Sequence, residues 1–261
     1  KNLFTELNKP IIFIEELSKS FGSCYPAKIS DSFNYDAIQS ILFTSGTEGL
    51  PKPVCLTYNN FYQSSMKWIK AIDLNKGETY LLSLPLYHIS GLAIIMRALH
   101  VGFAVNIDKP SSGISNANVF SVVPTMLIEL IKRKENIENL KKIRCIVLSG
   151  SKTPKSLLVD CEKYGLNIFL SYGMTETCSS ICGFWPLREN KNMWETVGKP
   201  FDGVNIEIKK NQVVIISNTV MEKYFNGKNI DGQFETSDMG SFENNYLKLN
   251  GRLDNMVVSG G

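Results

Sequence analysis

The residues that could do chemistry begin with a loop rich in glycine and hydroxyl groups, which follows an apolar, strand-prone run. The loop spans residues 44–52, between Phe43 and Pro53. Glycines let the backbone approach an anion, hydroxyl and free N–H groups donate hydrogen bonds to its oxygens, and Lys52 adds a positive charge. The spacing is not that of a Walker A loop, in which the lysine directly follows a glycine. The same residue types also suit an ordinary turn, so this segment alone leaves both a polyphosphate loop and a strand-end turn open.

The composition is that of a globular protein. The chain has 261 residues, 43% hydrophobic and 20% charged, with a net charge of +3 carried by scattered basic residues, which argues against a nucleic-acid partner. The apolar run at residues 89–99 is too short for a membrane span and contains Arg97. Six cysteines without a C-x-x-C pair, and only two histidines, exclude a zinc-type spacing and favour reduced thiols in a cytoplasmic protein.

Short apolar runs alternate with helical patterns as far as about residue 185. A helix is expected after Thr57 as its N-cap, a second from Pro124, and a third from Pro154 to a stop at Gly165. Alternating strands and helices predict an α/β fold with a mostly parallel sheet and flanking helices. The expected strands are 38–43, 80–84, 103–106, 119–122, 145–148 and 168–170.

The pattern changes after Pro186, where short strands are expected at 204–208, 213–217 and 246–249, separated by Asn-containing turns. This part predicts a smaller β-rich subdomain. The expected organisation is therefore a partial N-terminal segment (1–40), an α/β nucleotide- and acyl-binding subdomain (41–185), the β-rich subdomain (186–250) and a hinge (251–261). Because the chain does not begin with Met, we expect that its natural N-terminus is missing.

Five further segments follow the opening loop in a fixed order: 84–91, 147–151, 171–176, 236–238 and 251–254. Together with that loop, this ordered set resembles the acyl-adenylate-forming ligases, the superfamily of acyl-CoA synthetases, luciferases and peptide-synthetase adenylation domains. The resemblance covers about residues 41–261 and implies the fold of that superfamily's N-terminal domain. Within it, residues 85–92, Met96, Arg97 and 172–179 are most similar to the o-succinylbenzoate–CoA ligases of menaquinone biosynthesis.

The resemblance implies two half-reactions. A carboxylate attacks the α-phosphate of Mg-ATP to give acyl-AMP and pyrophosphate, and the thiolate of coenzyme A then displaces AMP to give a thioester. ATP, Mg²⁺ and coenzyme A as co-substrate are the implied cofactors. Because a carboxylate must approach a polyphosphate, catalysis is expected to rest on positioning and electrostatic stabilisation.

For the loop, the resemblance implies a cradle for the β- and γ-phosphates. Its residues would be Thr44, Ser45, Gly46, Thr47, Gly49 and Lys52. Two positions depart from the family pattern. Glu48 stands where a threonine is usual, and Pro53 replaces a usual glycine; a carboxylate at the first position repels phosphate unless it points to solvent or toward Mg²⁺.

At residues 171–176, the resemblance implies that Glu176 binds Mg²⁺, a hard cation that prefers oxygen ligands, and that Thr175 donates to the α-phosphate. Ser171 would line the nucleotide site and Tyr172 would stack on adenine. The alternative is a strand-to-loop turn with a solvated glutamate. Residues Ser149, Gly150 and Ser151 would line one face of adenine, and here too a plain β-to-α turn before Pro154 remains open.

In the C-terminal part, Asp238 matches the family's ribose-binding aspartate, and a carboxylate can accept hydrogen bonds from two vicinal hydroxyls. Ser237 replaces a usual glycine. Arg252 would reach ribose or phosphate, and Asp254 matches the hinge to a C-terminal domain that we expect to lie beyond Gly261. A solvated Arg252–Asp254 pair is the alternative.

Two residues bear on the acyl group. His88 matches an aromatic or histidine gate with a catalytic and substrate-binding role, although a lone histidine is also often a packed side chain. Arg97 occupies a position where the succinylbenzoate ligases carry an arginine. A buried arginine needs an anion, which would be either the substrate's second carboxylate or an internal Asp or Glu.

Three functions are therefore open. The first is an acid–CoA ligase of the succinylbenzoate type, with small-molecule acid, ATP and coenzyme A as partners and a homo-oligomer possible. The second is a ligase for another acid or an adenylation domain that loads a carrier protein. The third is a degenerate, non-catalytic adenylate-binding module, which Glu48, Pro53 and Ser237 would suggest.

Overall fold

The computed structural model describes residues 34–44 and 51–255. The described residues from 35 onward, and every element below, belong to one compact unit. No helix in the described part is long and apolar enough to cross a membrane.

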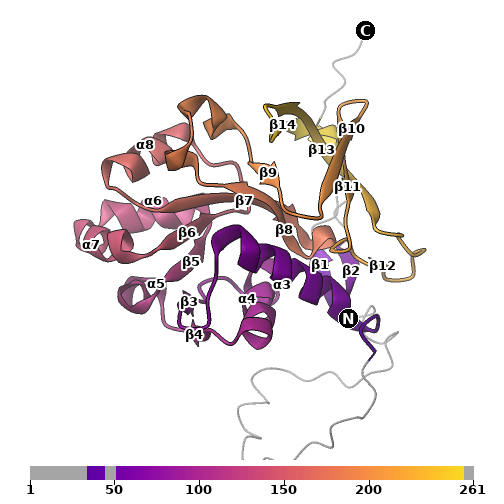
Figure 1. Ribbon diagram of the computed structural model, residues 1–261, viewed down its shortest axis with the longest axis horizontal. Helices are drawn as coiled ribbons and strands as arrows, with labels where there is room; N and C mark the ends of the chain where they lie inside the picture. Colours follow the sequence, from indigo (N-terminus) through magenta and orange to yellow (C-terminus); the bar gives the residue numbers. More distant parts are fainter. Residues whose placement is uncertain (1–33, 45–50, 256–261) are drawn as a thin grey trace, which may run out of the picture. The chain divides into compact units, whose positions relative to one another are not determined.

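The central element is a seven-stranded sheet with the order β4-β3-β5-β6-β7-β8-β9 (Figure 1). The first five strands in this order form four parallel pairs, whereas β8 and β9 are added antiparallel. The α/β class and mostly parallel sheet are thus confirmed. The strands are β3 (Thr79–Leu81), β4 (Ala104–Asn106), β5 (Val119–Val122), β6 (Cys145–Leu148), β7 (Ile168–Met174), β8 (Ser179–Phe184) and β9 (Lys199–Pro200).

Helices cover both faces of this sheet because its strands are apolar on both sides. In β6, Ile146 and Leu148 pack in one buried cluster, with helices α6 (Pro124–Lys132), α7 (Lys134–Lys142) and α8 (Lys155–Lys163). Cys145 and Val147 belong to the opposite cluster, with α3 (Tyr58–Ile72) and α4 (Ile89–Val101). The short elements are α5 (Pro110–Gly113), η1 (Ile114–Asn116), η2 (Thr175–Thr177), η3 (Pro186–Arg188), η4 (Lys191–Glu195) and η5 (Leu253–Asn255).

The helix ends follow the sequence signals. Thr57 is the N-cap of α3, and its hydroxyl accepts from the Asn60 N–H while the Asn60 side chain accepts from the Thr57 N–H. This reciprocal pair satisfies two backbone donors at the helix start. The helix α8 begins directly after Pro154, and Gly165 follows its last turn with φ +66°.

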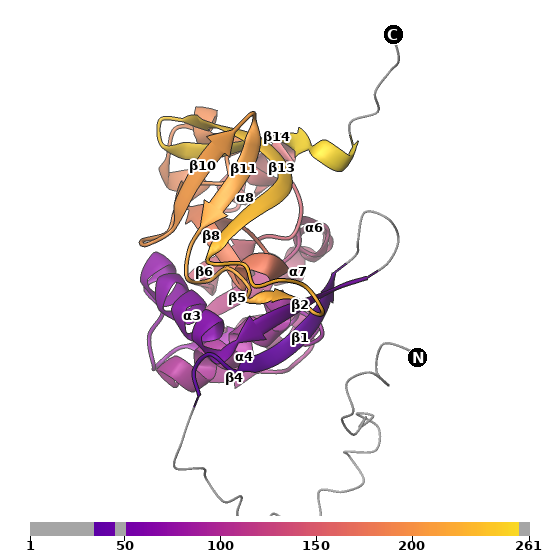
Figure 2. The same ribbon diagram turned by 90° about the vertical axis from the view of Figure 1, so that its right-hand side faces the viewer.

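A four-stranded antiparallel sheet, β10-β11-β13-β14, forms most of the part after residue 200. Its inward-facing Val213, Ile215 and Leu247 join the buried cluster of α3 and α4. In Figure 2, β10, β11 and β13 lie side by side at the top, above the β1–β2 hairpin. The division at residues 185 and 250 stays a prediction. The strands are β10 (Asn205–Lys209), β11 (Gln212–Ile216), β13 (Gln233–Glu243) and β14 (Tyr246–Arg252).

The third sheet differs from expectation. The strand predicted at 38–43 is β1 (Ile38–Thr44), and it lies outside the parallel sheet. It pairs antiparallel with β2 (Lys52–Thr57), from Ile38↔Thr57 to Thr44↔Lys52, and β2 pairs with β12 (Lys223–Tyr224). A parallel partner requires a crossover of a dozen or more residues, and the few residues between β1 and β2 allow only a hairpin.

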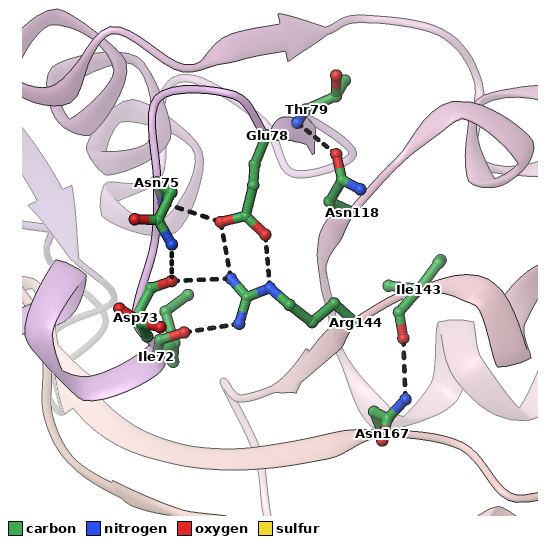
Figure 3. Close-up of polar contacts among 9 residues, drawn as sticks. All are labelled: Ile72, Asp73, Asn75, Glu78, Thr79, Asn118, Ile143, Arg144 and Asn167. Atoms are coloured by element: carbon green, nitrogen blue, oxygen red, sulfur yellow. Dashed lines mark hydrogen bonds and ion pairs between the residues drawn. The ribbon is translucent and has the colours of Figure 1, made fainter.

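Arg144 ties together the amino-terminal edge of the large sheet (Figure 3). It precedes β6, and its guanidinium binds the Glu78 carboxylate, which precedes β3, with Nη2–Oε2 at 2.8 Å. It also donates to the Ile72 carbonyl at the end of α3, at 2.7 Å. These contacts all lie at the amino-terminal ends of the parallel strands and do not involve their carboxyl ends.

Candidate functional site

Two adjoining clefts lie where the parallel strands end. The larger cleft, of about 680 Å³, is lined by Gly150, Ser151, Ser171, Asp238 and Arg252 among other residues. The smaller cleft has about 510 Å³. Gly150 and Arg252 line both. Among the residues predicted for the site, those that line the smaller cleft are Thr44, Lys52, His88, Ser149, Gly150, Thr175, Glu176 and Arg252.

Topology explains this convergence. Val123 follows β5, Ser149 follows β6, and Thr175 follows β7, so all three lie at the same edge of the parallel strands. Ligands of open α/β sheets bind in such a crevice outside the carboxyl ends of the strands. Gly150 has φ +85° in the turn after β6, a conformation that glycine adopts without strain.

The phosphate-loop prediction falls partly outside the described residues, which do not include Ser45, Gly46, Thr47 and Gly49. Both ends of the loop are described. Thr44 and Lys52 pair at the loop end of the β1–β2 hairpin, and both line the smaller cleft.

Glu176 lies in that cleft and is half-buried. The Tyr224 hydroxyl donates to its Oε1 at 3.0 Å, and the Met221 N–H donates to its backbone carbonyl at 2.8 Å. Burial, and next the Glu176 carboxylate, raise the pKa of Tyr224, so this hydroxyl stays protonated as a donor.

The donor set around Glu176 suits magnesium brought by a nucleotide. Among the described residues no group of three or more His, Cys, Asp or Glu side chains could hold a metal. Magnesium usually keeps several waters and binds through one or two carboxylates together with substrate phosphates. A single half-buried carboxylate beside Thr44 and Lys52 fits that pattern.

The turn behind Glu176 is strained. Cys178 has φ 52° and Ser179 has φ 92°, a region that non-glycine residues seldom occupy. Buried hydroxyls hold it. Ser64 of α3 donates to the Cys178 carbonyl at 2.5 Å, and Thr177 donates to the Ser179 carbonyl at 2.8 Å. Strand β7 also packs directly against this turn, since a Cβ on Gly173 would lie 2.1 Å from the Ser179 carbonyl oxygen.

Asp238 lies at the rim of the larger cleft. The Tyr172 hydroxyl donates to its Oδ2 at 2.6 Å, and Arg252 Nη1 is 3.9 Å from its Oδ1. Burial and then Asp238 raise the pKa of Tyr172 well above its ordinary value. Tyr172 holds the Asp238 carboxylate through this hydrogen bond and is not among the described residues that line either cleft. Its predicted stacking on adenine therefore stays a prediction.

Arg252 also forms two hydrogen bonds with Asp254, at 2.9 and 2.8 Å. These bonds raise the pKa of Arg252 and lower that of Asp254. Arg252 is thus both a cleft residue and the partner of the predicted hinge residue.

Arg97 is buried, with 3% of its surface exposed. Its Nη2 donates to Ser179 Oγ at 3.0 Å, and its Cζ lies 4.4 Å from the centroid of the Trp68 ring. Burial lowers its pKa to about 10, so it is charged at neutral pH. Within the described residues it forms no ion pair, and its Nε has no hydrogen-bond partner. The internal Asp or Glu considered above is therefore absent from the described part.

Arg97 does not itself line either cleft, but Ser179 does. The guanidinium therefore lies one serine side chain behind the wall of the smaller cleft. His88 is an exposed N-cap of α4 at the mouth of that cleft. Gly91 lets the first turn of α4 pack against the backbone of the preceding segment, because a Cβ there would lie 2.3 Å from the Pro85 carbonyl oxygen.

Several cleft residues carry no signal in the sequence. Tyr224 lines the smaller cleft, and Glu195 and Lys248 line the larger one. Glu195 accepts hydrogen bonds from Lys155 and Lys248, which lower its pKa to about 2. The predicted strand 246–249 contained Lys248 but ended before Arg252, whereas β14 carries both. Nothing in the sequence marked Tyr224.

Comparisons with known proteins agree with this geometry. The profile of a family described as AMP-binding enzyme matches residues 9–222. The 2-succinylbenzoate–CoA ligase of Bacillus licheniformis is 31% identical over 265 residues, which cover 92% of this chain and 55% of the relative. That of Bacillus subtilis is 30% identical, over 96% of this chain and 56% of the relative.

Solved structures give the same result. The o-succinylbenzoate coenzyme A synthetase of Bacillus subtilis, in complex with ATP and magnesium ion, matches with a TM-score of 0.84 and 28% identity, over 100% of this chain and 59% of that chain. Its complex with AMP matches with a TM-score of 0.81 and 29% identity, over 95% and 56%. The chain spans a little over half the length of these relatives.

Proposed function

Since this chain belongs to the AMP-binding enzyme family, we propose that the protein carrying it is an AMP-forming acid–CoA ligase that acts on o-succinylbenzoate in menaquinone biosynthesis. The proposal includes ATP, Mg²⁺ and coenzyme A as its small-molecule partners and the cytoplasm as its location. Relatives named 2-succinylbenzoate–CoA ligase, at 31% and 30% identity, support the choice of acid.

One observation carries the proposal. The smaller cleft brings together the end of the phosphate loop (Lys52), the turn after β6 (Ser149), the Thr175–Glu176 pair and Arg252. These come from four separate segments of the chain and supply two cations, two hydroxyls and one carboxylate. That set matches a magnesium nucleotide, whose phosphates need cations and donors and whose metal needs an oxygen ligand.

The roles follow from the placement. Thr44 and Lys52 would hold the terminal phosphates, Thr175 would donate to the α-phosphate, and Ser149, Gly150 and Ser151 would line adenine. Asp238, supported by Tyr172, would accept the ribose hydroxyls in the larger cleft, with Ser171 and Arg252 beside it. Glu176 would hold the magnesium ion, which neutralises phosphate charge when bound.

The first half-reaction then needs mainly orientation. An oxygen of the substrate carboxylate attacks the α-phosphorus, the bond to the bridging oxygen breaks, and pyrophosphate leaves with that electron pair. Lys52 and Arg252 stabilise the negative charge that collects there. In the second half-reaction the coenzyme A thiolate attacks the acyl carbon and AMP leaves.

Arg97 supports a substrate with a second carboxylate. It is a buried cation without an internal carboxylate among the described residues, and its hydrogen-bond partner Ser179 lines the smaller cleft. A carboxylate bound next to Ser179 would supply the missing counter-charge. His88 at the cleft mouth would adjoin the acyl group.

A panel of carboxylic acids tests the proposal through acid-dependent pyrophosphate release by the complete protein. We expect o-succinylbenzoate to give the highest kcat/KM, and benzoate and fatty acids to give much lower values. Release with another acid alone would leave an acyl-CoA ligase or carrier-loading adenylation domain of different specificity. Binding of nucleotide without release for any acid would point to a non-catalytic adenylate-binding module.

A further inference from the structure

We propose that Tyr224 is the residue that positions Glu176 for the magnesium nucleotide, and that it links this carboxylate to the phosphate-loop hairpin. The inference rests on the proposed function, because it concerns the same nucleotide site. It assigns a role to a side chain outside the segments that the sequence singled out.

The first observation is the contact itself. The Tyr224 hydroxyl donates to Glu176 Oε1 at 3.0 Å, and both residues line the smaller cleft. Tyr224 is half-buried, so its ring is held by packing while its hydroxyl reaches the cleft. Of the two carboxylate oxygens, Oε1 carries this hydrogen bond.

The second observation is that the segment around Tyr224 holds Glu176 at two points. The Met221 N–H donates to the Glu176 backbone carbonyl at 2.8 Å, three residues before the tyrosine contacts the side chain. Both the backbone and the carboxylate of Glu176 are therefore fixed by residues 221–224. A free rotation of this side chain away from the cleft would break the second of these bonds.

The third observation connects this segment to the phosphate loop. Tyr224 pairs with Val54, and Lys223 with Cys55, so β12 is a strand of the same sheet as the hairpin that ends in Lys52. The Phe225 N–H donates to the Pro53 carbonyl at 2.8 Å, and the Glu222 N–H to the Cys55 carbonyl at 3.1 Å. Pairing with the hairpin thus fixes the position of Tyr224 along β2, and the Tyr224 hydroxyl in turn fixes the Glu176 carboxylate.

The chemistry favours a positioning role. A neutral phenol donates one hydrogen bond without adding a counter-charge, so the second carboxylate oxygen of Glu176 is left available to a cation. Carboxylates that bind metals are usually held by such a neighbouring donor, and removing it typically costs 10–100-fold in metal affinity or activity. The phosphates on the hairpin side and the metal on the Glu176 side would then meet at a fixed separation.

Tyr224→Phe tests this proposal, because it keeps the ring and removes only the hydroxyl. Calorimetry of the complete protein should show that the dissociation constant for ATP in the presence of Mg²⁺ rises about tenfold. Binding of AMP in the presence of EDTA should stay as in the wild type, since no metal is involved. Tyr62→Phe, which alters an exposed tyrosine on α3, should leave both affinities unchanged.

Two results would overturn the proposal. Unchanged Mg-ATP affinity in Tyr224→Phe would mean that the hydroxyl does not orient the metal ligand. An equal loss of AMP and Mg-ATP affinity would make Tyr224 a packing residue of the sheet. A failure of the proposed function looks different, because the wild type itself would then bind ATP no better with Mg²⁺ than with EDTA.

Discussion

At the scale of single residues, Arg97 is the side chain whose surroundings are least complete. Its charge is buried against the Trp68 ring, with Ser179 as a neutral hydrogen-bond partner and an Nε that has none in the described part. A buried charge without a counter-charge is costly. An anion that enters beside Ser179 would remove that cost only when bound, which makes Arg97 a candidate for selecting dianionic acids.

Arg97→Lys should therefore discriminate between substrates. Lysine loses the planar fork that forms two bonds with a carboxylate. Leaving a buried carboxylate half-paired costs about 2–5 kcal/mol, so kcat/KM for o-succinylbenzoate should fall on the order of a few hundredfold. Benzoate, with one carboxylate, should be nearly unaffected. Equal losses for both acids, or a lower unfolding temperature without a substrate effect, would make Arg97 a structural residue.

Glu176→Gln should separate metal-dependent from metal-independent binding. The amide keeps the size and an acceptor oxygen for Tyr224 but removes the anionic ligand that a hard cation prefers. We expect Mg-ATP use in pyrophosphate release to weaken strongly, whereas AMP binding in EDTA stays close to wild type. A variant that retained the wild-type dependence on Mg²⁺ concentration would contradict the assignment of Glu176.

At the scale of elements, the strained turn between η2 and β8 depends on a helix far away in the sequence. Ser64 is buried in α3, and its hydroxyl is the donor to the Cys178 carbonyl. Ser64→Ala would leave that carbonyl buried without this partner, which costs about 1–3 kcal/mol. Urea unfolding should show a lower midpoint for Ser64→Ala than for Ser65→Ala, a matched change at the next buried position of the helix. Equal midpoints would show that the turn is held by other contacts.

The elements that the sequence predicted best are those with an unbroken apolar run. Strands 119–122 and 145–148 were predicted with their observed ends, because all their residues are buried. The strand that carries Asp238 was missed. In β13 the inward positions are occupied by Thr236, Asp238 and Gly240 rather than by apolar side chains. The apolar–polar alternation that marks a strand is therefore missing from this part of the sequence.

The candidate site was predicted in part for a related reason. Motif residues such as Lys52, Glu176 and Arg252 could be named because their types and order carry a resemblance, and the structure brings them to one cleft. Tyr224 could not be named, and the role of Ser179 could not be assigned although it lies in segment 172–179, because both roles come from pairing across the fold. The partner of Tyr224 is set by the β2–β12 register, and that of Ser179 by the packing of α4 against β8.

At the scale of the whole molecule, Glu195 joins a helix that covers the large sheet to a strand of the four-stranded sheet. It forms ion pairs with Lys155 of α8 at 2.6 Å and Lys248 of β14 at 3.0 Å. These two lysines lower its pKa from 4.5 to about 2. A lowered carboxyl pKa contributes stability that is present above the ordinary value and is lost as the pH falls toward the folded-state value.

Glu195→Gln should therefore lower the melting temperature at pH 6, and the difference from wild type should shrink progressively as the pH falls from about 4.5 toward 2. Thermal unfolding followed by circular dichroism at several pH values measures this. Because Lys155 is exposed and Lys248 is partly exposed, high salt should also reduce the difference. A difference that persisted unchanged below pH 4 would mean that another group controls this junction.

The pairing of β2 with both β1 and β12 has a consequence for biosynthesis. The hairpin can form as soon as β1 and β2 have been made, but Val54 must wait for Tyr224. At the usual 5–20 residues per second, that delay is on the order of ten to thirty seconds. During it, one edge of β2 is open to pairing with other nascent chains. Pro53 lies on that strand and has no N–H to offer, which limits wrong pairing at an open edge. The residue that departs from the family's loop pattern thus protects the hairpin until its third strand arrives.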